Sequence, residues 1–196
     1  MKLPTRDILI DNNCWEPRTD QVPGCPDVTA FKQQARLHQC LWREAQGYPA
    51  GTQPYDPAGG NQRTIGSRLD YRFAIEQKRN MITDAARTAA TTRVNTPQTD
   101  QMLDADRLWC DLLSSMPLCF NLFGPLSVDL DLAQQAVGVW FPDAPGKVSA
   151  VHLEWSPGRL DPGYLGNRTA FDAAIELDLG NGTFGIIGVE IKYHEH

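Results

Sequence analysis

The chain has 196 residues and a formal net charge of −6, with 41% hydrophobic and 21% charged residues. This length and balance are typical of one globular domain with its own core, and they argue against a disordered chain. The sequence has neither an apolar run long enough to cross a membrane nor a signal-peptide pattern, so we expect a cytoplasmic protein without a membrane partner.

The first part of the chain is predicted to be mainly helical. Residues 1–26 contain Pro4, Pro17, Pro23 and Pro26 and little periodicity, which predicts an irregular N-terminal arm. The segments predicted after it are a helix from Asp27 to Gly47, a loop over 48–66, a helix from Ser67 to before Pro97, a helix from Thr99 or Asp100 to Met116, an irregular apolar run over 117–125, and a helix from Asp129 or Asp131 to Trp140.

After residue 146 the hydrophobic pattern changes from helical spacing to alternation. Three strands are predicted, over residues 148–155, 170–177 and 184–193, with a loop over 156–169. Asn181-Gly182 favours a two-residue hairpin between the last two strands. The predicted fold class is therefore α+β or α/β. We expect one domain over residues 27–196, in which helices over 27–141 precede a three-stranded β-meander over 148–194.

Charge is unevenly distributed along the chain. Residues 1–100 carry 13 Lys and Arg against 11 Asp and Glu, whereas residues 101–196 carry 5 against 13. The basic residues concentrate between positions 63 and 93, where Arg68 and Arg72 are candidates for contacts with nucleic acid phosphates. A solvated helix face explains the same cluster equally well.

The predicted strands bring two acidic residues together. Alternation places Glu190 and Lys192 on one face of their strand and Ile191 on the other. Pairing through the hairpin can bring Asp172 close to Glu190. Two neighbouring carboxylates repel each other unless a cation lies between them, and Mg²⁺ or Mn²⁺ with its preference for oxygen ligands suits that position. The backbone carbonyl of Ile191 is a third candidate ligand.

This arrangement predicts phosphodiester hydrolysis. A bound divalent cation polarises a phosphate and lowers the pKa of a bound water, and Lys192 can orient that water or neutralise developing charge. We therefore interpret Asp172, Glu190 and Lys192 as catalytic. A Glu-x-Lys pair alone is a weak signal, because an exposed strand with an ion-paired face produces the same pattern.

Several segments resemble a family of predicted bacterial restriction endonucleases in the PD-(D/E)XK superfamily. They are Glu154-Trp-Ser-Pro-Gly-Arg159, Tyr164-Leu-Gly-Asn-Arg-Thr-Ala-Phe-Asp172, Gly185-Ile-Ile-Gly-Val-Glu-Ile-Lys-Tyr-His-Glu195, Leu41-Trp-Arg-Glu44 and Leu112-Leu-Ser-Ser-Met-Pro-Leu-Cys-Phe-Asn-Leu-Phe-Gly-Pro-Leu126. The resemblance implies a restriction-endonuclease-like core and a Mg²⁺-dependent DNA endonuclease of restriction or defence type. Asp172 matches the metal-binding Asp of the superfamily, although Phe171 replaces the preceding proline, and Glu190 and Lys192 match its Glu-x-Lys.

The resemblance also implies roles for further residues. Members of the superfamily often add a carboxylate from an earlier element, and Glu44 and Glu154 are the candidates, with a plain surface role as the alternative for each. In the 156–169 loop, Arg159 and Arg168 are candidates for DNA contacts.

The implied fold continues past the Glu-x-Lys strand with a helix and a further strand, whereas this chain ends at His196. We therefore expect a core truncated after that strand, whose edge is unprotected or pairs with a second copy in a homodimer. Two alternatives to the nuclease stay open: a non-catalytic nucleic-acid-binding or assembly module on a truncated nuclease scaffold, and a small-molecule phosphoesterase.

Overall fold

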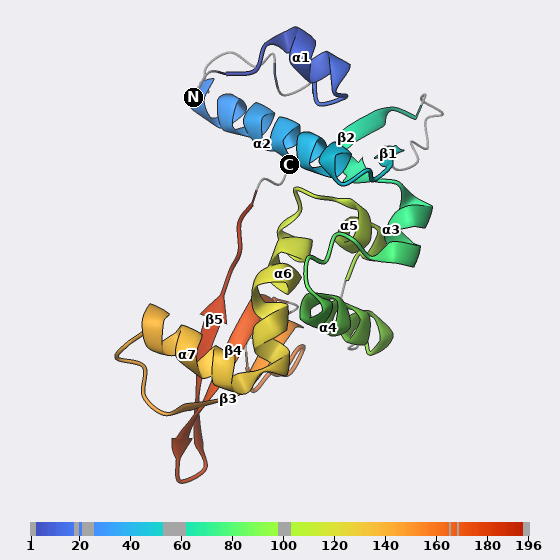
Figure 1. The fold of residues 1–196 in the computed structure, drawn as a ribbon. Coiled ribbons are helices and arrows are strands. Elements are labelled where there is room, and N and C mark those ends of the chain that lie inside the picture. The colour runs from blue at the N-terminus through green and yellow to red at the C-terminus, as the bar shows by residue number, and fades with distance from the viewer. Residues whose placement is uncertain are drawn as a thin grey trace. The chain divides into compact units, whose positions relative to one another are not determined.

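A computed structural model describes residues 3–17, 20, 26–52, 62–97, 103–164, 166–167 and 169–193 (Figure 1). The chain divides into two compact units. The first comprises Met1–Asn80, Asp106–Ser114 and Tyr193–His196, and the second comprises Met81–Ala105 and Ser115–Lys192. This division does not follow the boundary predicted at residue 26. The single domain over 27–196 stays a prediction.

The first unit contains helices and a two-stranded antiparallel sheet. Its elements are α1 (Arg6–Asp11), α2 (Pro26–Ala45), β1 (Ala50–Thr52), β2 (Thr64–Leu69), α3 (Tyr71–Gln77) and α5 (Ala105–Cys110). Helix α2 confirms the first predicted helix. Helix α1 lies in the segment predicted to be irregular, where Thr5 caps it by accepting a hydrogen bond from the Ile8 N–H. The neighbouring prolines had obscured that local signal.

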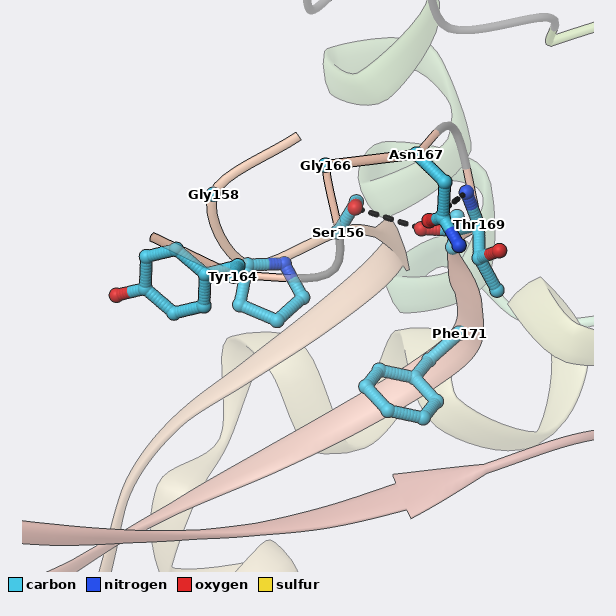
Figure 2. Close-up of a pocket in the computed structure, with 9 residues that line it drawn as sticks. Ser156, Gly158, Tyr164, Gly166, Asn167, Thr169 and Phe171 are labelled. Atoms are coloured by element: carbon cyan, nitrogen blue, oxygen red, sulfur yellow. Dashed lines mark hydrogen bonds between the residues drawn. The ribbon is translucent and has the colours of Figure 1, made fainter. Parts of the chain in front are cut away.

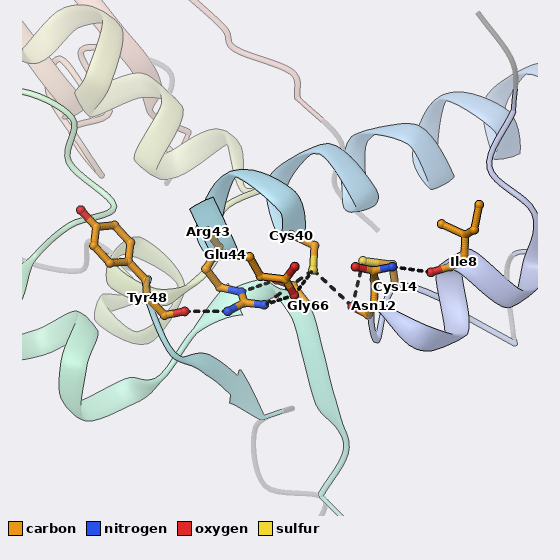
Figure 3. A network of polar contacts seen from close by, with 8 residues as sticks. All are labelled: Ile8, Asn12, Cys14, Cys40, Arg43, Glu44, Tyr48 and Gly66. Atoms are coloured by element: carbon orange, nitrogen blue, oxygen red, sulfur yellow. Dashed lines mark hydrogen bonds and ion pairs between the residues drawn. The ribbon is translucent and has the colours of Figure 1, made fainter. Parts of the chain in front are cut away.

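A buried arginine ties the first unit together around the end of α2. Arg43 is 7% exposed and donates to the backbone carbonyls of Tyr48, at 2.6 Å, and Gly66, at 2.8 Å. Figure 3 shows that its guanidinium also reaches the Cys40 sulfur and the Glu44 carboxylate. Because one side chain holds the loop after α2 and strand β2, the hydrogen bonds of Arg43 fix the position of the sheet against the helix.

The single helix predicted from Ser67 to Pro97 is wrong. Ser67 lies inside β2, and two shorter helices, α3 and α4 (Asp84–Asn95), follow. Asp70 caps α3 by accepting from the Phe73 N–H at 3.0 Å, and Lys78 ends that helix with a left-handed backbone. Thr83 then caps α4. Because the apolar residues keep helical spacing throughout this segment, the sequence pattern did not reveal where α3 begins and ends or where α4 begins.

The second unit packs helices on a three-stranded antiparallel sheet. Its elements are α4, α6 (Ser115–Val128), α7 (Leu130–Trp140), β3 (Lys147–Trp155), β4 (Phe171–Gly180) and β5 (Thr183–Val189). Helices α6 and α7 contact β3, and α6 also contacts β4 and α4 (Figure 1). The core of the sheet is the centre of β4, where Ala173, Ala174 and Ile175 are almost completely buried. The fold class predicted from the sequence is thus confirmed.

Helix α6 replaces the irregular run predicted over residues 117–125. Pro117 lies in the first turn, where a helix needs no N–H from it, and Pro125 lies in the last turn. The helix predicted before it, from Thr99 or Asp100 to Met116, is in fact α5 alone, and its predicted cap lies outside the described residues. Among the residues that are described, no helix is long and apolar enough to span a bilayer.

The strand order β3-β4-β5 and the predicted hairpin are confirmed. Asn181 and Gly182 have φ values of 54° and 72°, the left-handed pair that a two-residue type I′ turn requires, and they join Gly180 to its partner Thr183. Strand β5 ends at Val189, before the predicted end at Tyr193. The Glu-x-Lys residues therefore follow the strand and lie outside it.

Candidate active site

Two acidic residues face each other on neighbouring strands of the second unit, and a third follows the end of β5. Leu153 pairs with Ala173 and Trp155 pairs with Phe171, so Glu154 on β3 lies opposite Asp172 on β4. Directly opposed residues of antiparallel strands are near neighbours. Ala173 also pairs with Val189, the last residue of β5, so Glu190 follows directly after the last paired residues of β4 and β5.

Asp172 marks the point where β4 and β5 stop pairing. Its Oδ2 accepts a hydrogen bond of 2.6 Å from the backbone N–H of Ile191, which takes the place of the next ladder bond. Ile191 is 8% exposed, so this contact is partly shielded from water. The interaction fixes the orientation of the Asp172 carboxylate and puts it next to the peptide unit that joins Glu190 to Ile191.

Glu190 and Lys192 form an ion pair with each other. Their side chains are 55% and 72% exposed, so the pair lies at the surface and is weak. The pairing shows that both side chains extend to the same side of the chain after β5, as alternation predicts. A weak pair of this kind can open when a cation or a phosphate approaches.

Glu154 has an unusual backbone that a neighbouring helix supports. Its φ of 50° is one that non-glycine residues seldom adopt. Arg93 on α4 donates from Nε to the carbonyl of Leu153 at 3.1 Å and from Nη2 to the carbonyl of Glu154 at 3.2 Å. Burial lowers the pKa of Arg93, while the nearby Glu154 charge acts in the opposite direction. Arg93 is thus a positioning residue for the end of β3, a role that the sequence did not indicate.

A buried thiol on α6 lies beneath the acidic residues. The Cys119 S–H donates to the backbone carbonyl of Asp172 at 3.0 Å, and its side chain is fully buried. The pKa of Cys119 is strongly raised, first by burial and then by the charges of Glu154 and Asp172. Cys119 therefore stays a neutral thiol at physiological pH.

The donors at this site suit a hard divalent cation. Carboxylate and carbonyl oxygens are the ligands that Mg²⁺ takes in proteins, and Mg²⁺ usually needs only one or two carboxylates because it keeps several waters. Within the described part of the chain, no group of three or more His, Cys, Asp and Glu side chains is already gathered as a cage. The candidate site therefore offers carboxylate and carbonyl oxygens for a cation, but three such side chains are not gathered around one point among the described residues.

The other predicted site residues are placed as follows. Glu44 belongs to the first unit, where its half-exposed carboxylate pairs with Arg43. Arg68 is 6% exposed and ion-paired with both Asp106 and Asp111, which argues against a phosphate contact and indicates a structural role. Arg72 is exposed on α3.

Of the two loop arginines, Arg159 is partly buried in the loop between β3 and β4. The other, Arg168, lies outside the described residues.

Comparison with protein families matches residues 26–196 to the PD-(D/E)XK nuclease superfamily. Neither the curated proteins nor the solved structures with which the chain was compared gave a significant match. The matched range contains the whole acidic site and the sheet that carries it, and helices followed by a three-stranded antiparallel sheet agree with the fold of that superfamily. The chain therefore belongs to the PD-(D/E)XK nuclease superfamily.

Proposed function

We propose that this chain is a metal-dependent endonuclease that hydrolyses DNA phosphodiester bonds in a restriction or defence role. One observation supports the proposal: the Asp172 carboxylate, at the start of β4, accepts a hydrogen bond from the Ile191 N–H, which lies between Glu190 and Lys192 just after β5. This juxtaposition of two acids and an amine occurs in a chain of a nuclease superfamily.

Asp172, Glu190 and the carbonyl of Ile191 would hold Mg²⁺ or Mn²⁺, with Glu154 as the further carboxylate. A bound cation supplies polarisation of the scissile phosphate and a water of lowered pKa. The Ile191 N–H holds Asp172 in a fixed orientation before any ligand arrives. Glu190 can exchange its exposed partner Lys192 for the cation at little cost, because the ion pair between them is weak.

Lys192 acts on the reacting atoms in this proposal. Once Glu190 turns away, the ammonium group can orient the attacking water and offset the negative charge that develops on the phosphate oxygens. Removing one such group typically lowers kcat by about 10²- to 10³-fold. The Lys192→Ala variant should therefore lose most of its turnover and keep its affinity for the cation.

The test is cleavage of supercoiled plasmid DNA with Mg²⁺ or Mn²⁺ by the full chain and by Asp172→Asn, Glu190→Gln and Lys192→Ala. Matched controls are Asp178→Asn and Lys147→Ala, which change exposed residues of the same sheet at its hairpin end. We expect cleavage by the wild type and both controls only. DNA binding without cleavage under any of these conditions would favour the non-catalytic module, and hydrolysis of model phosphodiesters without DNA cleavage would favour the phosphoesterase.

The proposal includes a homodimer. In the described sheet β5 is an edge strand, and its Phe184 and Ile186 are 58% and 48% exposed. An apolar edge of this kind can pair with the same edge of a second copy. Light scattering should then show a dimer that Ile186→Lys converts to a monomer, and a monomeric wild type would contradict this part of the proposal.

A further inference from the structure

A small pocket opens beside the acidic site in the second unit. It has a volume of about 210 Å³, and Ser156, Tyr164, Asn167, Thr169 and Phe171 line it (Figure 2). Pockets for drug-sized ligands begin at roughly 300 Å³, so this pocket suits a single ring system. Phe171, which forms one wall, directly precedes Asp172.

The two aromatic walls are each supported by a glycine. A Cβ added to Gly158 would lie 2.0 Å from the Tyr164 ring, and one added to Gly188 would lie 2.5 Å from the Phe171 ring. Each ring therefore rests directly on backbone and has little space to move toward it. Tyr164 is nevertheless 62% exposed and Phe171 36% exposed, so both rings keep surface that a planar ligand can contact.

One edge of the pocket is polar. Asn167 Oδ1 accepts from the Thr169 N–H at 3.0 Å, and the Ser156 hydroxyl donates to the Thr169 carbonyl at 2.6 Å (Figure 2). These bonds close the base of the loop. Because the Asn167 oxygen accepts from Thr169, the N–H groups of the same amide are the donors that can recognise a ring oxygen or nitrogen.

We propose that this pocket binds one unstacked nucleobase of the substrate strand whose phosphate lies at Asp172. A nucleobase is planar, has an apolar face that can stack on Tyr164 or Phe171, and carries hydrogen-bonding groups on its edge for Asn167. Its sugar-phosphate would then extend along the start of β4 toward Asp172. The inference rests on the proposed nuclease function, because the choice of a nucleotide over another planar ligand comes from the adjoining site.

The test is a double-mutant cycle that combines a substitution in the protein with the removal of one base from the DNA strand. The full chain carrying Lys192→Ala, which should bind without cleaving, is titrated with fluorescein-labelled single-stranded DNA in the presence of Mg²⁺ and followed by fluorescence anisotropy. A single strand is used because a paired base would first have to leave its stack. An abasic nucleotide is moved along the strand one position at a time, and the series is repeated with Tyr164→Ala.

Stacking of one base on an aromatic side chain changes affinity by roughly 5- to 150-fold. We expect Tyr164→Ala to raise the Kd within this range and Tyr164→Phe to change it by less than about twofold, since the phenyl ring keeps the stack. One abasic position should weaken binding to the parent protein and have no further effect in Tyr164→Ala. Tyr71→Ala, at an exposed aromatic residue of α3 outside the pocket, should bind like the parent.

Additive effects of Tyr164→Ala and every abasic position, or no binding of the strand at all, would overturn the inference. Plasmid cleavage by the wild type together with such additivity would leave the nuclease proposal intact and reject the pocket alone. Base-dependent binding without plasmid cleavage by the wild type would reject the nuclease proposal and support the pocket.

Discussion

Replacement of Arg93 tests how the acidic site is positioned. Its guanidinium donates to the carbonyls of Leu153 and Glu154 from α4, and Leu153 is 7% exposed. Hydrogen bonds from a charged donor contribute about 1.5–3 kcal/mol, and a buried acceptor that loses its donor costs a similar amount. We therefore expect Arg93→Ala to lower the free energy of unfolding by about 2–3 kcal/mol.

The assay is urea unfolding followed by circular dichroism, with plasmid cleavage measured well below the unfolding midpoint. Cleavage should fall as well, because the backbone of Glu154 loses its support. Arg93→Lys should recover little, since one ammonium cannot reproduce the planar fork that reaches both carbonyls. Arg87→Ala on the same helix is the comparison, because its ion-pair partner Asp84 is 96% exposed and it donates to one backbone carbonyl only, that of Met81, at 3.3 Å, so it should cost less than Arg93→Ala. Equal costs for Arg93→Ala and Arg87→Ala would refute this reasoning.

Two further predictions concern packing and pH. Gly66→Ala would place a Cβ 2.1 Å from the Asn12 carbonyl oxygen, so chemical denaturation should show that the free energy of unfolding falls by about 1–3 kcal/mol. Gly138→Ala is the control, because no atom lies within 4 Å of its added Cβ, and it should be neutral or stabilising. Burial raises the pKa of Cys110 from 9.0 to about 12, so the folded state favours the neutral thiol. The stability that the neutral Cys110 thiol contributes is complete below pH 9. It is lost as the pH rises toward 12, with a slope of at most about 1.4 kcal/mol per pH unit. Denaturation should show that the free energy of unfolding of Cys110→Ala falls less steeply above pH 9 than that of the wild type. An identical fall in both proteins would contradict the assignment.

Local sequence signals were sufficient to predict the C-terminal sheet and the helix before it. The alternation after residue 146 predicts the strands, and the Asn181-Gly182 turn predicts the pairing of β4 with β5, which extends to Ala173 and Val189. Asp129 was equally informative, because its side chain caps α7 as predicted. Each of these signals depends on residues close together in the sequence or on one tight turn.

The features that sequence analysis missed depend on distant partners. Arg93 was interpreted as part of a basic cluster, yet its partners are backbone carbonyls about 60 residues away, which no side-chain pattern reveals. Ser67 was interpreted as a helix cap, but β2 forms because β1 pairs with it across a Pro- and Gly-rich segment. The pocket beside Phe171 depends on Gly158 and Gly188, whose contacts appear only when β4 and β5 are in place.

The central claim is that Asp172 and Glu190 share one divalent cation, and Mn²⁺ binding followed by electron paramagnetic resonance tests it most directly. The signal of free Mn²⁺ disappears when the ion is bound, so the method needs neither substrate nor activity. We predict one bound Mn²⁺ per chain in the wild type, Lys192→Ala and Asp178→Asn, and loss of that binding in both Asp172→Asn and Glu190→Gln. Undiminished binding in Asp172→Asn and Glu190→Gln, or no binding in the wild type, would contradict the claim.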